Sequence, residues 1–151
     1  MIADAPVLPL AGRPDLAAEA DRPILFPRGL LGFPECREFH LTATARPGFF
    51  WLRSLEHPAL RFLLVDPFLY FDGYSVELAD HDVGELAAGD SSEIAILATV
   101  TLPRTAADRC TANLQGPIAI NARRRVARQL VLPDSTFGLR CPLDLAPADA
   151  A

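Results

Sequence analysis

Proline and glycine interrupt this sequence so often that they divide it into short pieces. The chain has 14 prolines and 9 glycines among 151 residues, and they are densest between residues 23 and 34. The apolar runs between them have the length and composition of strands. We predict strands at residues 39–42, 49–52, 60–65, 74–78 and 94–102, the last as a central strand, and a hairpin from residues 118–120 and 126–132 that turns at 121–125.

Only one segment predicts an α-helix, about residues 80–88. Asp80 would cap its first N–H groups, and Gly89 would end it. One helix is too little for alternating β–α–β units. Many short strands with turns about every 8–12 residues instead predict an all-β protein. We expect a small single-domain β-barrel-like fold of short antiparallel strands with one or two short helices.

The length of the chain suits one domain with its own core. We expect a weakly ordered segment at 1–22, the β-barrel domain at 23–143 and a flexible tail at 144–151. No apolar run approaches the ~20 residues that span a bilayer. The first residues, with Asp4 and scattered prolines, do not resemble a secretory signal. We therefore expect a cytoplasmic protein that does not bind membranes.

The residues that carry catalysis or bind metals are sparse. Cys36, Cys110 and Cys141 are an odd number of scattered cysteines, which indicates reduced thiols. The sequence has no Cys-x-x-Cys or His-x-x-x-His pair and no nucleophile or phosphate-loop motif. We expect no enzyme activity, cofactor or metal. The alternative is a small β-barrel enzyme that binds a metal or ligand through His40 and Cys36.

The net charge of −5 argues against direct nucleic-acid binding, whose affinity depends on neutralising phosphates. It suits a basic protein partner instead. The one basic run is Arg123, Arg124 and Arg125 with Arg128. We interpret it as a solvated hairpin turn rather than an RNA site, because no aromatic residue for base stacking lies near it.

Two segments predict recognition rather than catalysis. Residues 111–121 contain three side-chain amides and no acid, base, thiol or imidazole, so they can bind a backbone but cannot shuttle protons. Residues 65–71 contain three aromatics near a proline turn, and these cannot all face one interior. Some would form an exposed patch of the kind that marks partner surfaces, with Tyr70 as the outward residue.

These segments also carry a resemblance to a known family. In order, the matching pieces are Phe-Pro-Arg-Gly-Leu-Leu-Gly-Phe (26–33), Arg-Glu-Phe (37–39), Phe-Trp-Leu-Arg-Ser (50–54), Val-Asp-Pro-Phe-Leu-Tyr-Phe (65–71), Thr-Ala-Asn-Leu-Gln-Gly-Pro-Ile-Ala-Ile-Asn (111–121) and Gln-Leu-Val-Leu (129–132). Together they resemble FliW, the bacterial flagellar assembly factor, over residues 24–143. The chain departs from the family pattern at Arg28, where an acid is usual, at Leu31, where proline is usual, and at Arg53, where glutamine is typical.

The resemblance implies a non-enzymatic protein, expected to be a monomer when free, that binds flagellin and the RNA-binding regulator CsrA. The implied mechanism is partner switching, in which flagellin level controls how much CsrA is left to repress flagellin translation. The residues that we expect to contact partners are Phe68, Tyr70, Asn113, Leu114, Gln115 and Asn121, with Phe68 and Leu114 as apolar supports.

Overall fold

The computed structural model describes Leu16, residues 22–89, 93–103, Thr105, and residues 109–132 and 137–143. The predicted tail at 144–151, and the predicted segment at 1–22 apart from Leu16 and Arg22, lie outside these residues. The described strands are β1 Ile24–Leu25, β2 Glu38–Ala43, β3 Phe49–Ser54, β4 Arg61–Val65, β5 Ile94–Thr101, β6 Thr111–Ala112, β7 Ile118–Asn121, β8 Val126–Gln129 and β9 Cys141–Pro142. The structure also contains a 3-10 turn, η2 (Pro67–Leu69), and an α-helix, α1 (Asp80–Glu85).

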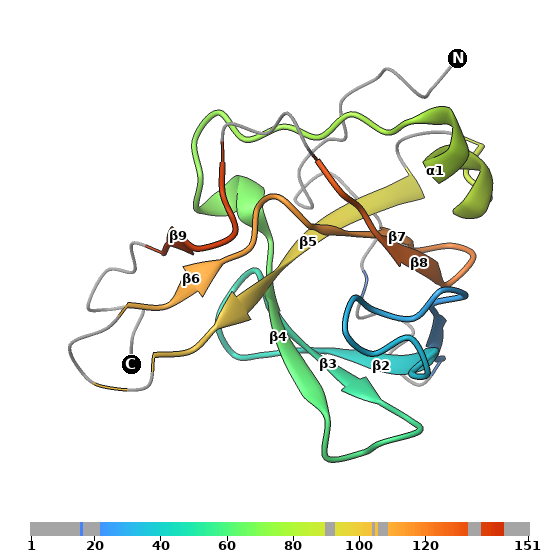
Figure 1. Cartoon of the computed structure of the whole chain (residues 1–151), viewed down its shortest axis with the longest axis horizontal. Helices are drawn as coiled ribbons and strands as arrows, with labels where there is room; N and C mark the ends of the chain where they lie inside the picture. Colours follow the sequence, from blue (N-terminus) through green and yellow to red (C-terminus); the bar gives the residue numbers. More distant parts are fainter. Residues whose placement is uncertain are drawn as a thin grey trace.

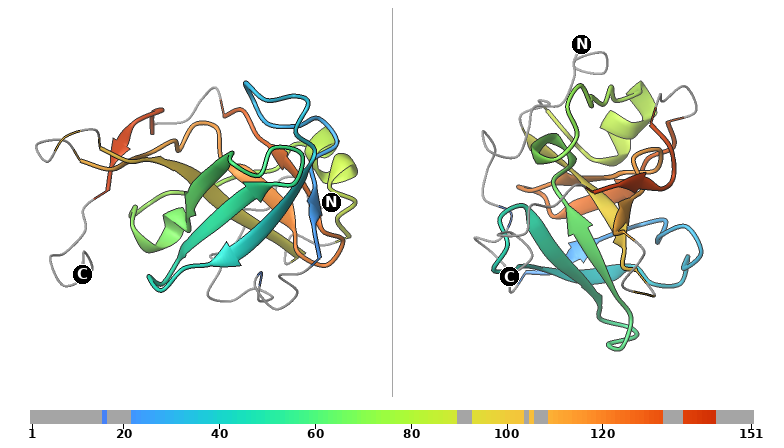
Figure 2. Two further views of the ribbon diagram at one scale, coloured as in Figure 1. Left: turned by 90° about the horizontal axis from the view of Figure 1, so that it is seen from below. Right: turned by 90° about the vertical axis from the view of Figure 1, so that its left-hand side faces the viewer.

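Seven of these strands close into a barrel (Figures 1 and 2). The order is β4-β3-β2-β1-β8-β7-β5, and β5 pairs back with β4 through Leu63 and Val100. β6 and β9 continue the sheet from β5 at the left of Figure 1. The pairs are antiparallel except for β1 with β8, where Leu25 lies beside Val126 in parallel. The predicted all-β, barrel-like fold is confirmed.

Two apolar cores lie on the two sides of the barrel wall. The barrel core takes side chains from all seven barrel strands, among them Ile24, Phe39, Leu52, Leu64 and Leu97. The outer core lies against the outside of β5 and β7 and is covered by the chain between η2 and the end of α1. Because the wall is covered on both sides here, all five residues of β5 from Ile94 to Ala98 are buried. This explains the uninterrupted apolar run of the predicted central strand.

The structure corrects two predictions about the covering segment. Residues 74–78 do not form one of the named strands. Their alternation is real, because Tyr74, Val76 and Leu78 are buried and the residues between them are exposed, but it packs them on the outer core. The alternating pattern that predicted a strand therefore reflects the burial of one side of this segment and not the pairing of a strand in the sheet.

The limits of α1 also differ from the prediction. Ala79, not Asp80, is the N-cap, and it makes no side-chain capping bond. The helix ends at Glu85 rather than near Gly89, because Ala87 adopts a left-handed backbone with φ of 53° and the N–H groups of Ala87 and Ala88 turn back to the carbonyls of Gly84 and Val83. The side-chain amide of Asn121 then donates to the carbonyl oxygens of Leu86 at 2.8 Å and Ala87 at 3.5 Å. No helix in the described ranges has the length and apolar character needed to cross a bilayer.

The turn after β3 is held to the start of β2 by the carboxylate of Glu56. Its oxygens accept from the backbone N–H groups of Arg37 at 3.1 Å and Glu38 at 3.2 Å. These bonds, led by that of Arg37, lower the pKa of Glu56 below its ordinary value of 4.5. Because these bonds favour the ionised carboxylate, the stability that they give to this turn depends on pH.

A Glu56→Gln variant is therefore expected to be less stable than the wild type at neutral pH. A carboxyl group with a lowered folded-state pKa stabilises the fold above its unfolded pKa, and the stabilisation is lost as pH falls through the folded value. The difference in the free energy of unfolding should thus shrink as pH falls below 4.5. Urea unfolding over a pH series measures it, with the exposed Glu77→Gln as control. A difference that is constant with pH would contradict the role of the charge.

Candidate functional site

Three of the segments that carry the family resemblance meet at the side chain of Gln129. Its oxygen accepts from the N–H of Leu31 at 3.1 Å, and its nitrogen donates to the carbonyl of Gly116 at 2.9 Å. Alongside, the N–H of Leu132 donates to the carbonyl of Gln115 at 2.9 Å. One amide therefore joins the turn before β2, the loop before β7 and the end of β8.

Two exposed apolar residues flank this junction. Leu31 and Val131 are each 68% exposed, although apolar side chains of this size are usually buried. Gln115 is half-buried in the loop that Leu132 contacts, and its side-chain amide makes no hydrogen bond with the described residues. We call Leu31 and Val131 the Leu31–Val131 surface. Sequence reasoning missed Leu31 and Val131, because nothing in a local apolar run shows which residues stay outside the core.

The aromatic segment at 65–71 is largely committed to the fold. Asp66 is buried, and its carboxylate accepts from the N–H of Phe68 at 3.0 Å, which forms the 3-10 turn. Tyr70, expected to face outward, is half-buried. Its hydroxyl donates to the carbonyl of Pro47 at 3.1 Å, and its ring lies 5.4 Å from that of Phe49. The exposed apolar side chain of this turn is Leu69, at 51%.

Tyr74 joins the two predicted recognition segments. Its hydroxyl donates to the carbonyl of Leu114 at 2.7 Å, and its ring lies 5.6 Å from that of Phe68. Burial raises the pKa of Tyr74 well above its ordinary value, with a smaller effect of Cys141 in the same direction. The tyrosine is thus a neutral donor that holds the two segments together rather than a proton carrier.

Two of the predicted contact residues are not on the surface. Leu114 is fully buried in the outer core. Asn121 is also fully buried; besides its bonds to the end of α1, its side-chain oxygen accepts from the N–H groups of Arg123 and Arg124, both at 3.1 Å. Both are corrected here to structural residues. Partner contact by Phe68, Tyr70, Asn113 and Gln115, all half-buried, stays a prediction.

The side chain of Asn113 fixes the conformation of the loop before β7. Its side-chain oxygen accepts from the N–H groups of Gln115 at 3.1 Å and Gly116 at 2.9 Å. An Asn113→Ala variant is expected to lose about 1–2 kcal/mol of stability, because both donors lose their acceptor. The nearby Gln115→Ala should change stability by less than about 0.5 kcal/mol, because the half-buried side chain of Gln115 makes no hydrogen bond with the described residues. Equal losses in denaturant titrations would show that Asn113 does not hold the loop.

The arginines of the β7–β8 turn do not form one basic patch. Arg125 is buried and donates to the carbonyls of Leu16 at 3.2 Å and Arg22 at 3.0 Å. Arg128 is paired with Asp82 and Glu85 on α1. Only Arg123 and Arg124 are exposed, which agrees with a solvated turn better than with an RNA site.

The structure does not bring together His40 and Cys36, the pair proposed for the alternative enzyme. His40 lies between Phe39 and Leu41 on β2, both of which face the barrel core, so the alternation of a strand places it on the outer face. Cys36 is buried in the barrel core. The three cysteines are free thiols, as predicted. His57, which the sequence did not single out, lies near Cys36 instead.

Comparison with known proteins agrees with these features. The sequence profile of the FliW protein family matches residues 13–143. The chain is 40% identical over 116 residues to the flagellar assembly factor FliW of Moorella thermoacetica, covering 76% of this chain and 73% of that protein. It is 38% identical over 130 residues to that of Geobacter sulfurreducens, covering 85% and 80%.

A solved structure is similar as well. The crystal structure of a flagellar assembly factor FliW superposes with a TM-score of 0.75 at 31% sequence identity, covering 84% of this chain and 89% of the other. Residues 13–143, which the family profile matches, include the strands of the barrel and the segments that meet at Gln129. The chain belongs to the FliW protein family.

Proposed function

We propose that this protein is a non-enzymatic flagellar assembly factor that binds flagellin and a CsrA-type RNA-binding regulator. The relatives reported above are named flagellar assembly factors. The observation that carries the proposal is the Leu31–Val131 surface, which is uncharged, exposed and built from segments that carry the family resemblance. Exposed apolar side chains gathered at one place are typical of a protein-binding surface.

Binding of the two partners would couple flagellin level to flagellin translation. When flagellin accumulates in the cytoplasm, it occupies this protein and leaves CsrA free to repress. When flagellin is exported, the freed protein captures CsrA and translation resumes. The protein needs no cofactor for this role and acts as a monomer between partners.

The charges of the chain support a basic partner such as CsrA. Of the two arginines that depart from the family pattern, Arg28 is ion-paired with Glu85 at 2.6 Å, so its charge is balanced within the chain. Arg53 is exposed on β3 and lies between His40 and Arg61 in the sheet. The net charge of −5 remains available for long-range attraction to a basic protein. The Leu31–Val131 surface carries no acid, so we assign it to flagellin.

The proposal is tested by capture of purified native flagellin and purified CsrA on the immobilised protein. We expect both to bind, CsrA with the steeper decrease as salt is raised, because screening weakens attraction between charges more than apolar contact. Added flagellin should release bound CsrA. Capture of neither partner would overturn the proposed function, and binding of both without release would overturn the switching mechanism.

A further inference from the structure

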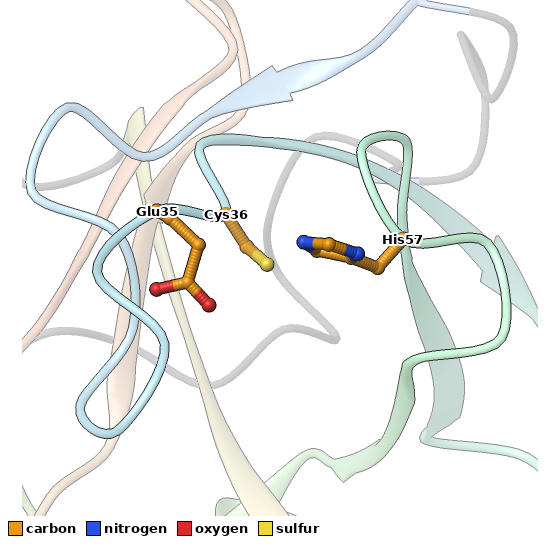
Figure 3. Close-up of side chains that lie close together, drawn as sticks. All are labelled: Glu35, Cys36 and His57. Atoms are coloured by element: carbon orange, nitrogen blue, oxygen red, sulfur yellow. The ribbon is translucent and has the colours of Figure 1, made fainter.

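A cysteine, a histidine and a carboxylate meet where the turn before β2 faces the turn after β3. The ligand atoms of Glu35, Cys36 and His57 all lie within 4.8 Å of one another. Figure 3 shows the sulfur of Cys36 between the carboxylate of Glu35 and the ring of His57. Glu35 and Cys36 lie on the same turn before β2 as Leu31, but the proposed function does not use this cluster.

The register of the β2–β3 hairpin brings the cluster together. Phe39 pairs with Ser54, and one step further the N–H of Leu55 donates to the carbonyl of Glu38 at 2.9 Å. At the next step the carboxylate of Glu56 accepts from the N–H of Arg37. Extended past the strand ends at Glu38 and Ser54, the same register sets Cys36 opposite His57, and their ligand atoms do lie within 4.8 Å of each other.

Hydrogen bonds also fix the backbone at both positions. The N–H of His57 donates to the hydroxyl of Ser54 at 3.0 Å, and its carbonyl accepts from Leu60 at 2.8 Å. The N–H of Cys36 donates to the carbonyl of Phe33 at 3.2 Å. The two ligand-bearing turns are therefore held in place before any ion binds, which lowers the ordering cost of binding.

The side chains combine a fixed thiol with two adjustable ligands. Cys36 is fully buried, whereas Glu35 and His57 are exposed and can rotate. Thiolate, imidazole and carboxylate are the three ligand types that zinc takes in proteins. Ligand atoms about 2.0–2.3 Å from one zinc ion lie roughly 3.5 Å apart in tetrahedral geometry. From the present separations, each atom would need to move by less than about 1 Å to reach that geometry.

We propose that Glu35, Cys36 and His57 bind a zinc ion, with the fourth position open to water. The thiolate and the carboxylate together balance the charge of the ion. The bound ion ties the turn before β2 to the turn after β3, so its binding free energy adds to the stability of the folded chain. Because the thiol and the imidazole must be deprotonated to bind, affinity falls as pH is lowered.

The test uses the full chain purified without an affinity tag, stripped with a chelator and kept reduced. Titration with zinc should show one ion per chain and a higher thermal midpoint. Cobalt, as a spectroscopic substitute, should give a sulfur-to-metal charge-transfer band. A His57→Gln variant is expected to bind zinc at least about tenfold more weakly. Even the loss of a side chain that only hydrogen-bonds to a metal ligand weakens metal binding by that factor.

Two variants serve as matched controls. His40→Gln removes the nearby histidine on the outer face of β2, and Cys110→Ser removes a thiol elsewhere; both should retain binding and the cobalt band. The main substitution is made at His57, because His57 is exposed whereas Cys36 is buried. Replacing His57 should leave the folded core intact. Absence of stoichiometric zinc, a cobalt spectrum without a thiolate band, or unchanged affinity in His57→Gln would overturn the site.

Discussion

An Asn121→Ala variant is expected to lose about 3 kcal/mol of stability, because each buried polar group left without a partner costs roughly 1–3 kcal/mol. The side chain is fully buried, and its amide nitrogen donates to the carbonyl of Leu86 at 2.8 Å. Its oxygen accepts from the N–H groups of Arg123 and Arg124. Alanine would remove the bond to the carbonyl of Leu86 after α1 and the two bonds that shape the β7–β8 turn.

The measurement is denaturant unfolding followed by circular dichroism, with Gln115→Ala as the matched control. Both variants remove a side-chain amide, but that of Gln115 is half-exposed and makes no hydrogen bond with the described residues. For a domain of this size, the expected loss lowers the thermal midpoint by roughly 6–12 °C. A loss below about 1 kcal/mol, the size of a single ordinary hydrogen bond, would contradict the structural role given to Asn121.

The same residue shows where prediction from sequence ends. Alternation along β7 correctly indicates that Ile118 and Ile120 share one face, which the structure places in the barrel core. It also correctly puts Asn121 on the other face. In a barrel with one core that face would be exposed to solvent, but here the segment that ends in α1 covers it. The sequence does not reveal this second layer, so Asn121 was wrongly expected on the surface, and Leu114, expected as an apolar support of the contact, is buried in the outer core.

Elements that depend on local composition were predicted well. The central strand and the β7–β8 hairpin are close to their expected positions, because apolar runs and turn residues specify them locally. Features that depend on distant contacts were not predicted. Residues 74–78 alternate like a strand yet pack on the outer core, and Asn121 is buried because its amide bonds to the carbonyl of Leu86 after α1.

The Glu35–Cys36–His57 cluster shows the same limit for a site. Sequence reasoning looked for metal ligands a few residues apart and considered Cys36 with His40. The residue opposite Cys36 is fixed by the register of the β2–β3 hairpin, in which Phe39 faces Ser54. Once that register is known, His57 follows directly. The zinc titration, and not the spacing of ligands in the sequence, therefore tests the prediction that the protein binds no metal.

A Leu31→Asp, Val131→Asp double variant is expected to weaken flagellin binding by at least about a hundredfold. Burying an aliphatic side chain at a contact contributes about 1.5–3 kcal/mol, and two such side chains exceed the roughly 2.7 kcal/mol that corresponds to a hundredfold. Both side chains are 68% exposed, so the folded protein should tolerate the substitutions with little change in unfolding free energy. The loss would thus appear in binding, measured by calorimetry with native flagellin, and not in the melting curve.

The matched control is Leu55→Asp with Leu102→Asp. These two leucines are also exposed, but one lies in the turn after β3 and the other follows β5, away from Gln129. The control adds the same charge at two other exposed apolar positions, although these leucines are less exposed, at 39% and 54%. If both double variants weaken binding equally, added negative charge rather than the Leu31–Val131 surface controls the affinity. If the Leu31→Asp, Val131→Asp variant binds flagellin within about threefold of the wild type, a difference below 1 kcal/mol, flagellin does not contact this surface.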